Sequence, residues 1–371
     1  MPGYLGRFID SLADYCGKVI CFLHSPRLQE ASLMDYRVVA KNVKLIDIGP
    51  HASVMQRTLR PRLFTSPISA YAAELDILLI RGPTPLLPAL AKVSSIPIAL
   101  LLVGDYVTGV NDLPQPRWRK ELIRVWSHWN KWGQKRATRQ GLTFVNSRVL
   151  YNELKGKTPN LHEVRTTTLN KGDFYLRPNT CLSKPYRLLY VGRMDRSKGL
   201  LQMAEAVSIL VERGEDVTLD LVGWQEHGDP ICEEIRMFAN AKNVADRIRF
   251  LGPHPVGPEL FKYYQQADIF LIASFASEGF PRTIWEAMAN SLPVIATKVG
   301  SIPAFIEGAA ELIPPGRVEA LADAVAKLIH HPEVRQNLIL RGLELAQKNT
   351  LEIQVGAMVA KMKFWLETQH G

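Results

Sequence analysis

Two glutamates in the second half of the chain have a spacing that could serve chemistry. Glu278 and Glu286 lie in the stretch ASEGFPRTIWEAM (276–288), on either side of Pro281, which suits the first position of a helix. A helix N-terminus favours anions such as phosphate. Because a bound phosphate would repel the two carboxylates, they are expected to accept hydrogen bonds from neutral hydroxyls instead, such as those of a sugar or a ribose. The alternative is that both residues are ordinary surface acids.

A basic turn earlier in the same half is the second candidate. The sequence RMDRSKG (193–199) places Arg193 and Lys198 around a turn that leads into a predicted helix near Gly199. Exposed backbone N–H groups and the helix dipole would add to the two side-chain charges, which makes this turn a candidate anion site. The alternative is a solvated basic turn, because short motifs of this kind also occur by chance.

These residues need elements to position them, and the sequence predicts parallel sheets. Short apolar runs alternate with longer helical stretches, as in α/β sheets that helices cover on both faces. Ligands bind such sheets at the carboxyl ends of the strands, so the loops that follow the strands are where a site is expected. The predicted strands are 18–23, 43–49, 75–81, 96–103 and 142–146 in the first half, and 187–192, 217–223, 248–252, 268–274 and 292–297 in the second half.

Composition indicates two domains. The chain has 371 residues, 47% of them apolar, which is too long for one compact core. Proline and small polar residues at 177–186 mark a boundary, so the expected domains are 1–180 and 181–350, with 351–371 a helix that crosses back to the first domain. No apolar run approaches the ~20 residues of a membrane-spanning helix, and the four cysteines form neither a CxxC pair nor a zinc pattern. We therefore expect a cytoplasmic, soluble protein with free thiols.

The first domain supplies two further candidates. The sequence GYLGRFIDSLADY (3–15) predicts a turn containing Gly3 and Gly6 and then a helix, while GDYVTG (104–109) offers Asp105 to an acceptor hydroxyl. The alternatives are a flexible N-terminus and an aspartate that caps a turn. In a doubly wound domain such a glycine turn normally follows a strand, so we expect that the first strand of this domain is missing and that the natural chain begins further upstream.

The second half resembles a known family. In order and spacing, VGRMDRSKG, LDLVG, RIRFLG and ADIFLIASFASEGFPRTIWEAMANSLPVIATKVGSIP are similar to the C-terminal half of glycosyltransferase family 4, the group 1 glycosyltransferases, which are retaining enzymes of GT-B fold. The resemblance covers about residues 187–330. It implies two Rossmann-like doubly wound domains that face each other across a cleft, with a nucleotide-sugar donor in the second. Pro281 stands where many members have glycine, and proline removes one backbone donor.

The resemblance implies a role for each candidate residue. Arg193 and Lys198 would contact the donor diphosphate and Glu278 the hydroxyls of the transferred sugar; these three are the expected catalytic residues. Glu286 would bind the ribose of the nucleotide. The other residues expected to bind substrate are Gly3, Gly6, Asp105, Gly192, Trp224, Pro253, His254, Gly279, Phe280, Pro281, Arg282 and Thr283.

Positive charge is concentrated in the first domain. The part of the chain before the boundary has a net charge of +12 and the part after it −3, and residues 117–139 hold eight Lys or Arg, one acid and four of the seven tryptophans. Cations with interleaved indoles on a helix favour the surface of an anionic membrane, whereas no nucleic-acid-binding motif is present. The alternative is that Trp126, Trp129 and Trp132 face the core.

These observations predict a retaining glycosyltransferase that moves a sugar from a nucleotide-diphosphate sugar to a glycan or lipid-linked acceptor, in polysaccharide or glycolipid biosynthesis at the inner face of the membrane. No cofactor beyond the donor is expected, and no metal, because the chain has no Asp-x-Asp triplet. The absence of a complete P-loop and of GxGxxG argues against a kinase or a nicotinamide-dependent oxidoreductase. Two alternatives stay open: a nucleotide-sugar epimerase of the same fold, and a non-catalytic protein that binds nucleotide-sugar.

Overall fold

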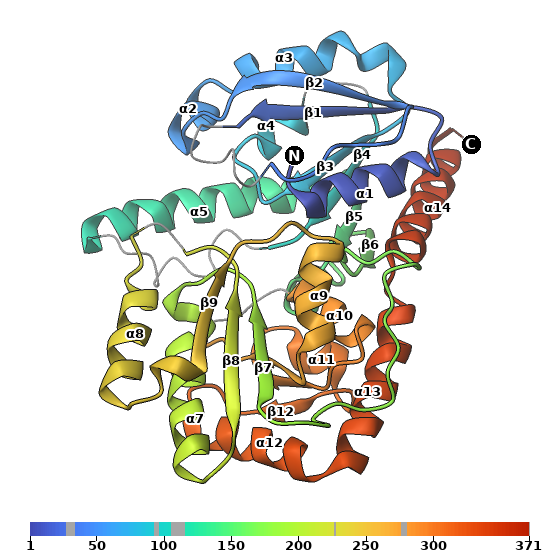
Figure 1. Ribbon diagram of the computed structural model, residues 1–371. Helices are drawn as coiled ribbons and strands as arrows, with labels where there is room; N and C mark the ends of the chain where they lie inside the picture. The colour runs from blue at the N-terminus through green and yellow to red at the C-terminus, as the bar shows by residue number, and fades with distance from the viewer. Residues whose placement is uncertain (27–33, 93–95, 105–115, 226–227, 276–279, 371) are drawn as a thin grey trace. The chain divides into compact units, whose positions relative to one another are not determined.

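The protein folds as two compact units. A computed structural model describes residues 1–371 except 27–33, 93–95, 105–115, 226–227, 276–279 and 371 (Figure 1). The N-terminal unit consists of residues 1–166 and 351–371, and the C-terminal unit consists of residues 167–350.

The boundary between the units lies after Thr166 rather than near residue 180. The segment that follows Thr166 is held by hydrogen bonds to the C-terminal unit. The Tyr175 N–H donates to the carbonyl of Ala289 at 2.9 Å, and the Arg177 guanidinium donates to the carbonyl of Ala267 at 2.7 Å. The proline-rich stretch that predicted a linker is therefore part of the second unit.

The N-terminal unit contains two parallel sheets. β1 (Val19–Ser25) pairs with β2 (Val43–Pro50), and a four-stranded sheet has the order β3 (Leu78–Gly82), β4 (Ile98–Leu102), β5 (Leu142–Val145) and β6 (Asn160–Glu163). Among the described strands, β1 pairs only with β2 and β3 only with β4, so one continuous sheet does not run through this unit. That a further strand belongs to it stays a prediction. Its helices are α1 (Gly3–Ala13), α2 (Val54–Leu59), α3 (Arg62–Ala70), α4 (Leu87–Leu90), α5 (Arg117–Thr138), α6 (Arg148–Leu154) and α14 (Leu351–His370).

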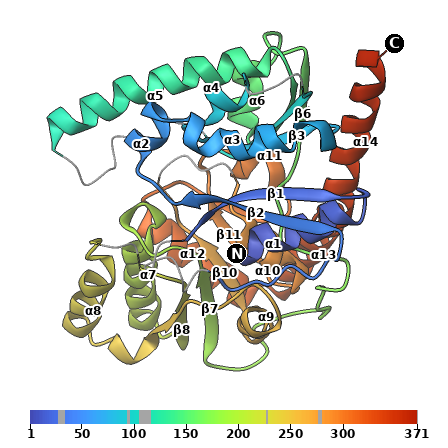
Figure 2. The same cartoon turned by 90° about the horizontal axis from the view of Figure 1, so that it is seen from above.

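The C-terminal helix α14 is part of the N-terminal unit. It packs beside α1 and β5, as Figures 1 and 2 show, and buries Val355 and Trp365 in a core that includes Phe144 of β5. The Tyr15 hydroxyl donates to the carbonyl of Glu352 at 2.8 Å. Apolar burial of this kind holds the last helix against the first one.

The C-terminal unit is built on one parallel sheet of six strands. Its order is β12 (Glu311–Ile313), β11 (Val294–Thr297), β10 (Ile269–Ile272), β7 (Tyr186–Val191), β8 (Val217–Val222) and β9 (Ile248–Gly252). The helices of this unit are α7 (Leu200–Glu212), α8 (Ile231–Ala241), α9 (Pro258–Gln266), α10 (Arg282–Ala289), α11 (Ile302–Ile306), α12 (Val318–His330) and α13 (Pro332–Gln347). They lie on two sides of the sheet, with α7, α8 and α12 in one group and α9, α10 and α13 in the other (Figures 1 and 2).

The core of this unit explains why its strands read as continuous apolar runs. Leu189, Phe270 and Ile295, from three neighbouring strands, have exposed fractions of 0%. A strand covered on both faces has no polar side, so apolar residues occupy successive positions. All ten strands that the apolar runs predicted are present, and the prediction of parallel sheets is confirmed.

Candidate active site

The two candidate loops border the same point of the C-terminal sheet. From β7 the chain proceeds outward through β8 and β9, and from β10 it proceeds in the opposite direction through β11 and β12. Reversal of the strand order opens a crevice at the carboxyl ends of the two central strands, and ligands of doubly wound sheets bind there. The turn after β7 carries Arg193 and Lys198, and the loop after β10 leads to α10.

The turn after β7 is held by a buried aspartate. Asp195, with an exposed fraction of 8%, caps the 3₁₀ helix Arg196–Lys198 by accepting the Ser197 N–H at 2.9 Å. Its other carboxylate oxygen lies 2.7 Å from Nε of Arg193. Part of the Arg193 charge is therefore already compensated within the turn, while Lys198 is placed by the capped helix that it ends.

Close backbone contact joins the two loops. The Phe275 N–H donates to the carbonyl of Ser197 at 2.9 Å. Gly199 follows with φ of 70° and ψ of 29°, and a Cβ at this position would lie 2.1 Å from the carbonyl oxygen of Ala273. Only glycine allows this approach, so Gly199 brings the turn after β7 against the loop after β10.

The predicted residues around the start of α10 are only partly described. Glu278 and Gly279 lie outside the described residues, so their expected contacts with the sugar stay predictions. Pro281 is the N-cap residue of α10, and no side chain of the described residues caps it. The positive end of the helix dipole lies at this start of the helix, next to the loop after β10.

The neighbours of Pro281 differ in accessibility. Phe280 is buried, and its ring lies 4.5 Å from that of Trp285 between centroids, so its side chain belongs to the core. Arg282 and Thr283 are half-buried in the first turn of the helix. Their expected contacts with substrate stay predictions.

Glu286 is buried rather than presented at the surface. Its exposed fraction is 2%, and its carboxylate accepts hydrogen bonds from the hydroxyls of Thr168 and, at 2.7 Å, of Tyr264. Burial, together with the neighbouring Glu286, raises the pKa of Tyr264 well above its usual value, so this phenol stays a donor. The alternative that Glu286 is an ordinary surface acid is wrong, and its role toward a ribose stays a prediction.

Other predicted substrate residues follow neighbouring strands at the same edge. Gly192 directly follows β7 and donates its N–H to the carbonyl of Val222 at 2.9 Å. The half-exposed Trp224 follows β8. Pro253 and His254 follow β9, where the His254 ring contacts Tyr263 with Nε2 and the hydroxyl oxygen 2.9 Å apart. The sheet therefore brings these loops to one edge, as the sequence predicted.

The predicted glycine turn at the N-terminus is wrong. Helix α1 begins at Gly3, so Gly3 and Gly6 lie in its first two turns. The Asp35 carboxylate accepts the Gly3 N–H at 2.7 Å, and a Cβ at Gly6 would lie 2.1 Å from the Tyr36 ring. Packing of Tyr36 against the helix, rather than an open loop, requires the small residue at position 6. Asp105, the other candidate in this unit, lies outside the described residues.

Sequence reasoning missed a polar cluster at the carboxyl ends of β1 and β2. The rings of His24 and His51 lie 5.6 Å apart, and Ser25 donates to Asp47 at 2.5 Å. Burial, followed by the neighbouring Arg57 and His51, lowers the pKa of His24, so its imidazole is neutral at neutral pH. Polar residues directly after two predicted parallel strands were the signal that could have found this cluster.

Comparison with known proteins agrees with this architecture. A crystal structure of Anabaena HepE in complex with UDP and glucose matches with a TM-score of 0.74 at 18% identity, over 97% of this chain and 95% of that chain. Sucrose-phosphate synthase from Thermosynechococcus elongatus matches with a TM-score of 0.74 at 19% identity, over 97% and 92% of the two chains. The chain therefore has the GT-B fold, with two Rossmann-like parallel-sheet units.

Sequence comparison places the C-terminal unit in a family. Residues 185–331 match the family described as glycosyl transferases group 1, which confirms the resemblance to glycosyltransferase family 4. D-inositol 3-phosphate glycosyltransferase of Corynebacterium glutamicum is 37% identical over 150 residues, 39% of this chain and 35% of that protein. The amylovoran biosynthesis glycosyltransferase AmsK of Erwinia amylovora is 32% identical over 162 residues, 42% of this chain and 39% of that protein. The match thus spans well under half the length of these relatives.

Proposed function

We propose that the protein is a retaining glycosyltransferase that transfers a sugar from a nucleotide-diphosphate sugar to a lipid-linked or glycan acceptor. The observation that carries the proposal is the match of residues 185–331 to the group 1 family. The same unit places the basic turn with Arg193 and Lys198 where the strand order of its sheet reverses. The complex of HepE with UDP and glucose, which shares the fold, supports a uridine nucleotide donor. A role in polysaccharide or glycolipid biosynthesis belongs to the same proposal, and the similarity to AmsK, an amylovoran biosynthesis glycosyltransferase, supports it.

The proposed chemistry separates charge. Breaking the bond between the sugar and the diphosphate builds positive charge on the anomeric carbon and negative charge on the departing phosphate oxygen. Lys198, the remaining charge of Arg193 and the dipole at the N-terminus of α10 would stabilise that oxygen. Glu278 would hold hydroxyls of the transferred sugar. The acceptor hydroxyl would attack from the face that the leaving group vacates and give its proton to the departing phosphate oxygen.

Nucleotide binding tests the proposal directly. Thermal unfolding is followed with UDP, GDP, ADP and their common sugar conjugates, and we expect one nucleotide series to stabilise the C-terminal unit. A ligand at a hundred times its dissociation constant stabilises by about 2.7 kcal/mol. Release of free nucleotide only when an acceptor is added would support transfer and argue against epimerisation. A donor that binds but is never turned over would contradict the proposal that the protein is an enzyme.

Peripheral binding to an anionic membrane is the second part of the proposal. Five large apolar side chains lie at helical spacing on α5, and each has an exposed fraction above 60%; this α5 stripe consists of Trp118, Leu122, Val125, Trp129 and Trp132. The helix also carries seven Lys or Arg, and Arg139, directly after its last residue, is the eighth basic residue of this segment. The described residues contain no helix long and apolar enough to cross a membrane. An amphipathic helix with basic flanks binds at the interface of anionic lipids.

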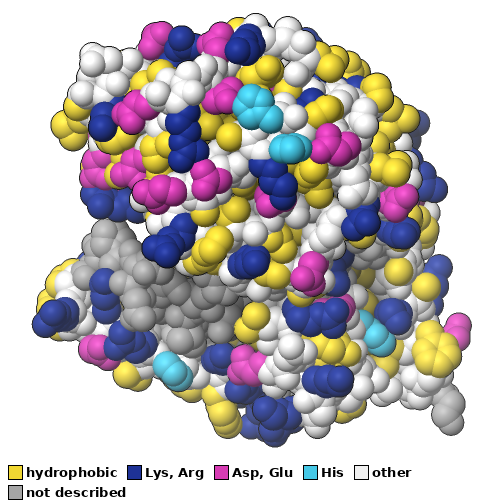
Figure 3. All heavy atoms as spheres, turned by 90° about the horizontal axis from the view of Figure 1, so that it is seen from below, with side chains coloured by type: hydrophobic (Ala, Val, Ile, Leu, Met, Phe, Trp, Pro, Cys, Tyr) yellow, Lys and Arg dark blue, Asp and Glu magenta, His cyan; other side chains and the backbone are white. Residues whose placement is uncertain are grey.

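The exposure of the tryptophans tests the alternative that they face the core. Trp129 and Trp132 are exposed, so the alternative that they face the core is wrong. Trp126 is half-buried and donates its indole N–H to Thr58 at 3.2 Å. On the face in Figure 3, basic and acidic side chains are interspersed, so the positive net charge does not gather into one patch there. The proposed membrane contact therefore rests on α5 itself.

Replacing the first part of the stripe should weaken membrane binding. We expect the variant Trp118→Ser/Leu122→Ser/Val125→Ser to bind phosphatidylglycerol vesicles at least about tenfold more weakly, because burying one such side chain contributes about 1.5–3 kcal/mol. Vesicle sedimentation measures the change. The control Met237→Ser/Leu340→Ser/Phe364→Ser removes three other exposed apolar side chains and should bind as the wild type does. Equal binding by both variants would contradict the proposal.

A further inference from the structure

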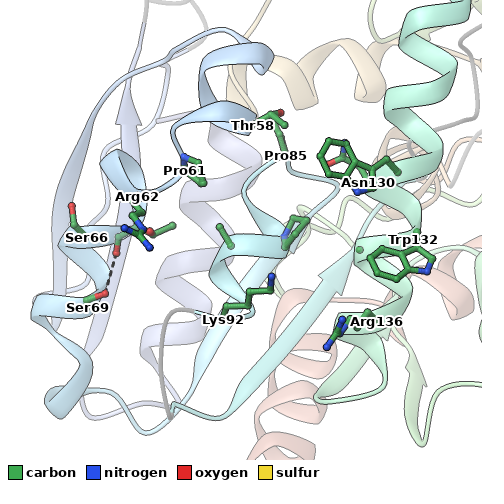
Figure 4. Close-up of a pocket in the computed structure, with 15 residues that line it drawn as sticks. Thr58, Pro61, Arg62, Ser66, Ser69, Pro85, Lys92, Asn130, Trp132 and Arg136 are labelled. Atoms are coloured by element: carbon green, nitrogen blue, oxygen red, sulfur yellow. Dashed lines mark hydrogen bonds between the residues drawn. The ribbon is translucent and has the colours of Figure 1, made fainter.

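A pocket of about 840 Å³ lies among helices α3, α4 and α5 of the N-terminal unit (Figure 4). Of the described residues that were expected to bind donor or acceptor, none lines it. Its volume is within the range of about 300–1,000 Å³ that is typical of small-molecule sites. The pocket is therefore large enough for a ligand, and its lining is separate from the described residues of the candidate active site.

Among the described residues that line the pocket, all charged side chains are cationic. They are Arg62 of α3, Lys92 just after α4 and Arg136 of α5. Figure 4 shows Arg62 beside Ser66 and Ser69 on one wall and Arg136 across from them on α5. Guanidinium groups, an ammonium and hydroxyls supply the charge and the several donors that phosphate oxygens accept. The lining therefore matches an anion of the phosphate type.

The pocket also continues the α5 stripe. Trp129 and Trp132, with exposed fractions of 66% and 61%, line the pocket and form the C-terminal end of the stripe. Tryptophan combines an apolar body with a polar N–H, which suits the boundary between lipid and water. A phosphate carried by a membrane lipid would meet the cations while its glycerol or sugar and its chains lie along the indoles.

We propose that this pocket binds the phosphate headgroup of an anionic membrane lipid. The inference rests on the membrane contact proposed above and deepens it, because it replaces general charge attraction with recognition of one chemical group. A free phosphate has the same chemistry, but it would leave the exposed tryptophans without a partner. The continuity of the pocket with the stripe therefore favours the lipid as the source.

Vesicles of matched charge test the inference on the full chain. Phosphatidylcholine vesicles carry either phosphatidic acid or oleate at equal surface charge, and binding is measured by sedimentation. For the variant Arg62→Gln/Arg136→Gln we expect the loss on phosphatidic acid to exceed the loss on oleate by about tenfold or more. Removing two surface charges weakens binding to both vesicles, whereas a specific contact with phosphate is lost only on phosphatidic acid. The control Arg117→Gln/Arg119→Gln removes the same charge from α5 outside the pocket, and it should lower binding to both vesicles equally.

Each other outcome overturns the inference in a recognisable way. Equal losses on both vesicles for Arg62→Gln/Arg136→Gln would mean that the pocket cations act only as general surface charge. A wild type that binds phosphatidic acid no better than oleate, but is stabilised against thermal unfolding by inorganic phosphate, would identify a site for free phosphate. A wild type that binds neither vesicle would overturn the membrane contact as well. Stabilisation by nucleotides is measured in parallel, because its failure would overturn the proposed transfer reaction and leave the headgroup preference intact.

Discussion

Replacing Lys198 by alanine should lower turnover by about 10²–10³-fold while leaving the fold intact. Removal of one group that stabilises developing negative charge typically has an effect of this size. The side chain is half-buried in a turn that Asp195 caps through the Ser197 N–H, and this cap is retained in the variant. The rate of nucleotide release from the donor that stabilises the protein, in the presence of acceptor, measures the change.

The control for this prediction is Lys242→Ala. Lys242 is an exposed cation of the same unit, 3.7 Å from Glu212, and an exposed ion pair contributes little to stability. Turnover by Lys242→Ala should equal that of the wild type. If Lys198→Ala is equally active, the basic turn is only a solvated turn, and the assignment of the diphosphate to it fails.

Lys198 is a sharper probe of the site than Glu286. The Glu286 carboxylate accepts hydrogen bonds from Thr168 and Tyr264 in the core, and its removal would leave buried donors unsatisfied. Such a loss costs about 1–3 kcal/mol for each group. A weaker response of Glu286→Ala to nucleotide would therefore mix lost binding with lost stability, whereas Lys198→Ala separates the two.

Sequence periodicity predicted ten of the twelve strands in the described residues. Buried parallel strands are continuous apolar runs, so β4 and β10 were visible as IPIALLLV and DIFLIAS. β6 and β12 were missed. β6 has the sequence NLHE and is only half-buried, and β12 has three residues, which is too short for a pattern. A strand whose place comes from pairing with its neighbour has no signal of its own.

The loops of the candidate site that directly follow strands could be predicted from the sequence. Contacts between residues that are far apart in the sequence could not. The turn after β7 was placed correctly because it follows an apolar run directly. The burial of Glu286 depends on Thr168, which is 118 residues earlier in the chain, and spacing alone carries no information about such a contact. Gly6 was assigned to a turn for the same reason, since the Tyr36 ring that requires glycine there lies 30 residues away.

Replacing Gly199 by alanine should destabilise the C-terminal unit by about 2–5 kcal/mol. The left-handed conformation costs a residue with a Cβ about 1–2 kcal/mol, and overpacking adds about 1–3 kcal/mol. Here the overpacking is against backbone, because the new Cβ would lie 2.1 Å from the carbonyl oxygen of Ala273. The turn after β7 and the loop after β10 would have to separate, so nucleotide binding should weaken as well. Urea unfolding followed by circular dichroism measures the first effect and nucleotide-induced stabilisation the second.

Gly214→Ala separates the two causes. Gly214 also has a positive φ, of 86°, but a Cβ there would meet no atom within 4 Å. This control should therefore lose only about 1–2 kcal/mol and keep its affinity for nucleotide. Equal losses in the two variants would mean that backbone conformation alone requires glycine at position 199. A larger loss in Gly199→Ala, together with weaker nucleotide binding, would show that close contact between the two loops is what shapes the donor site.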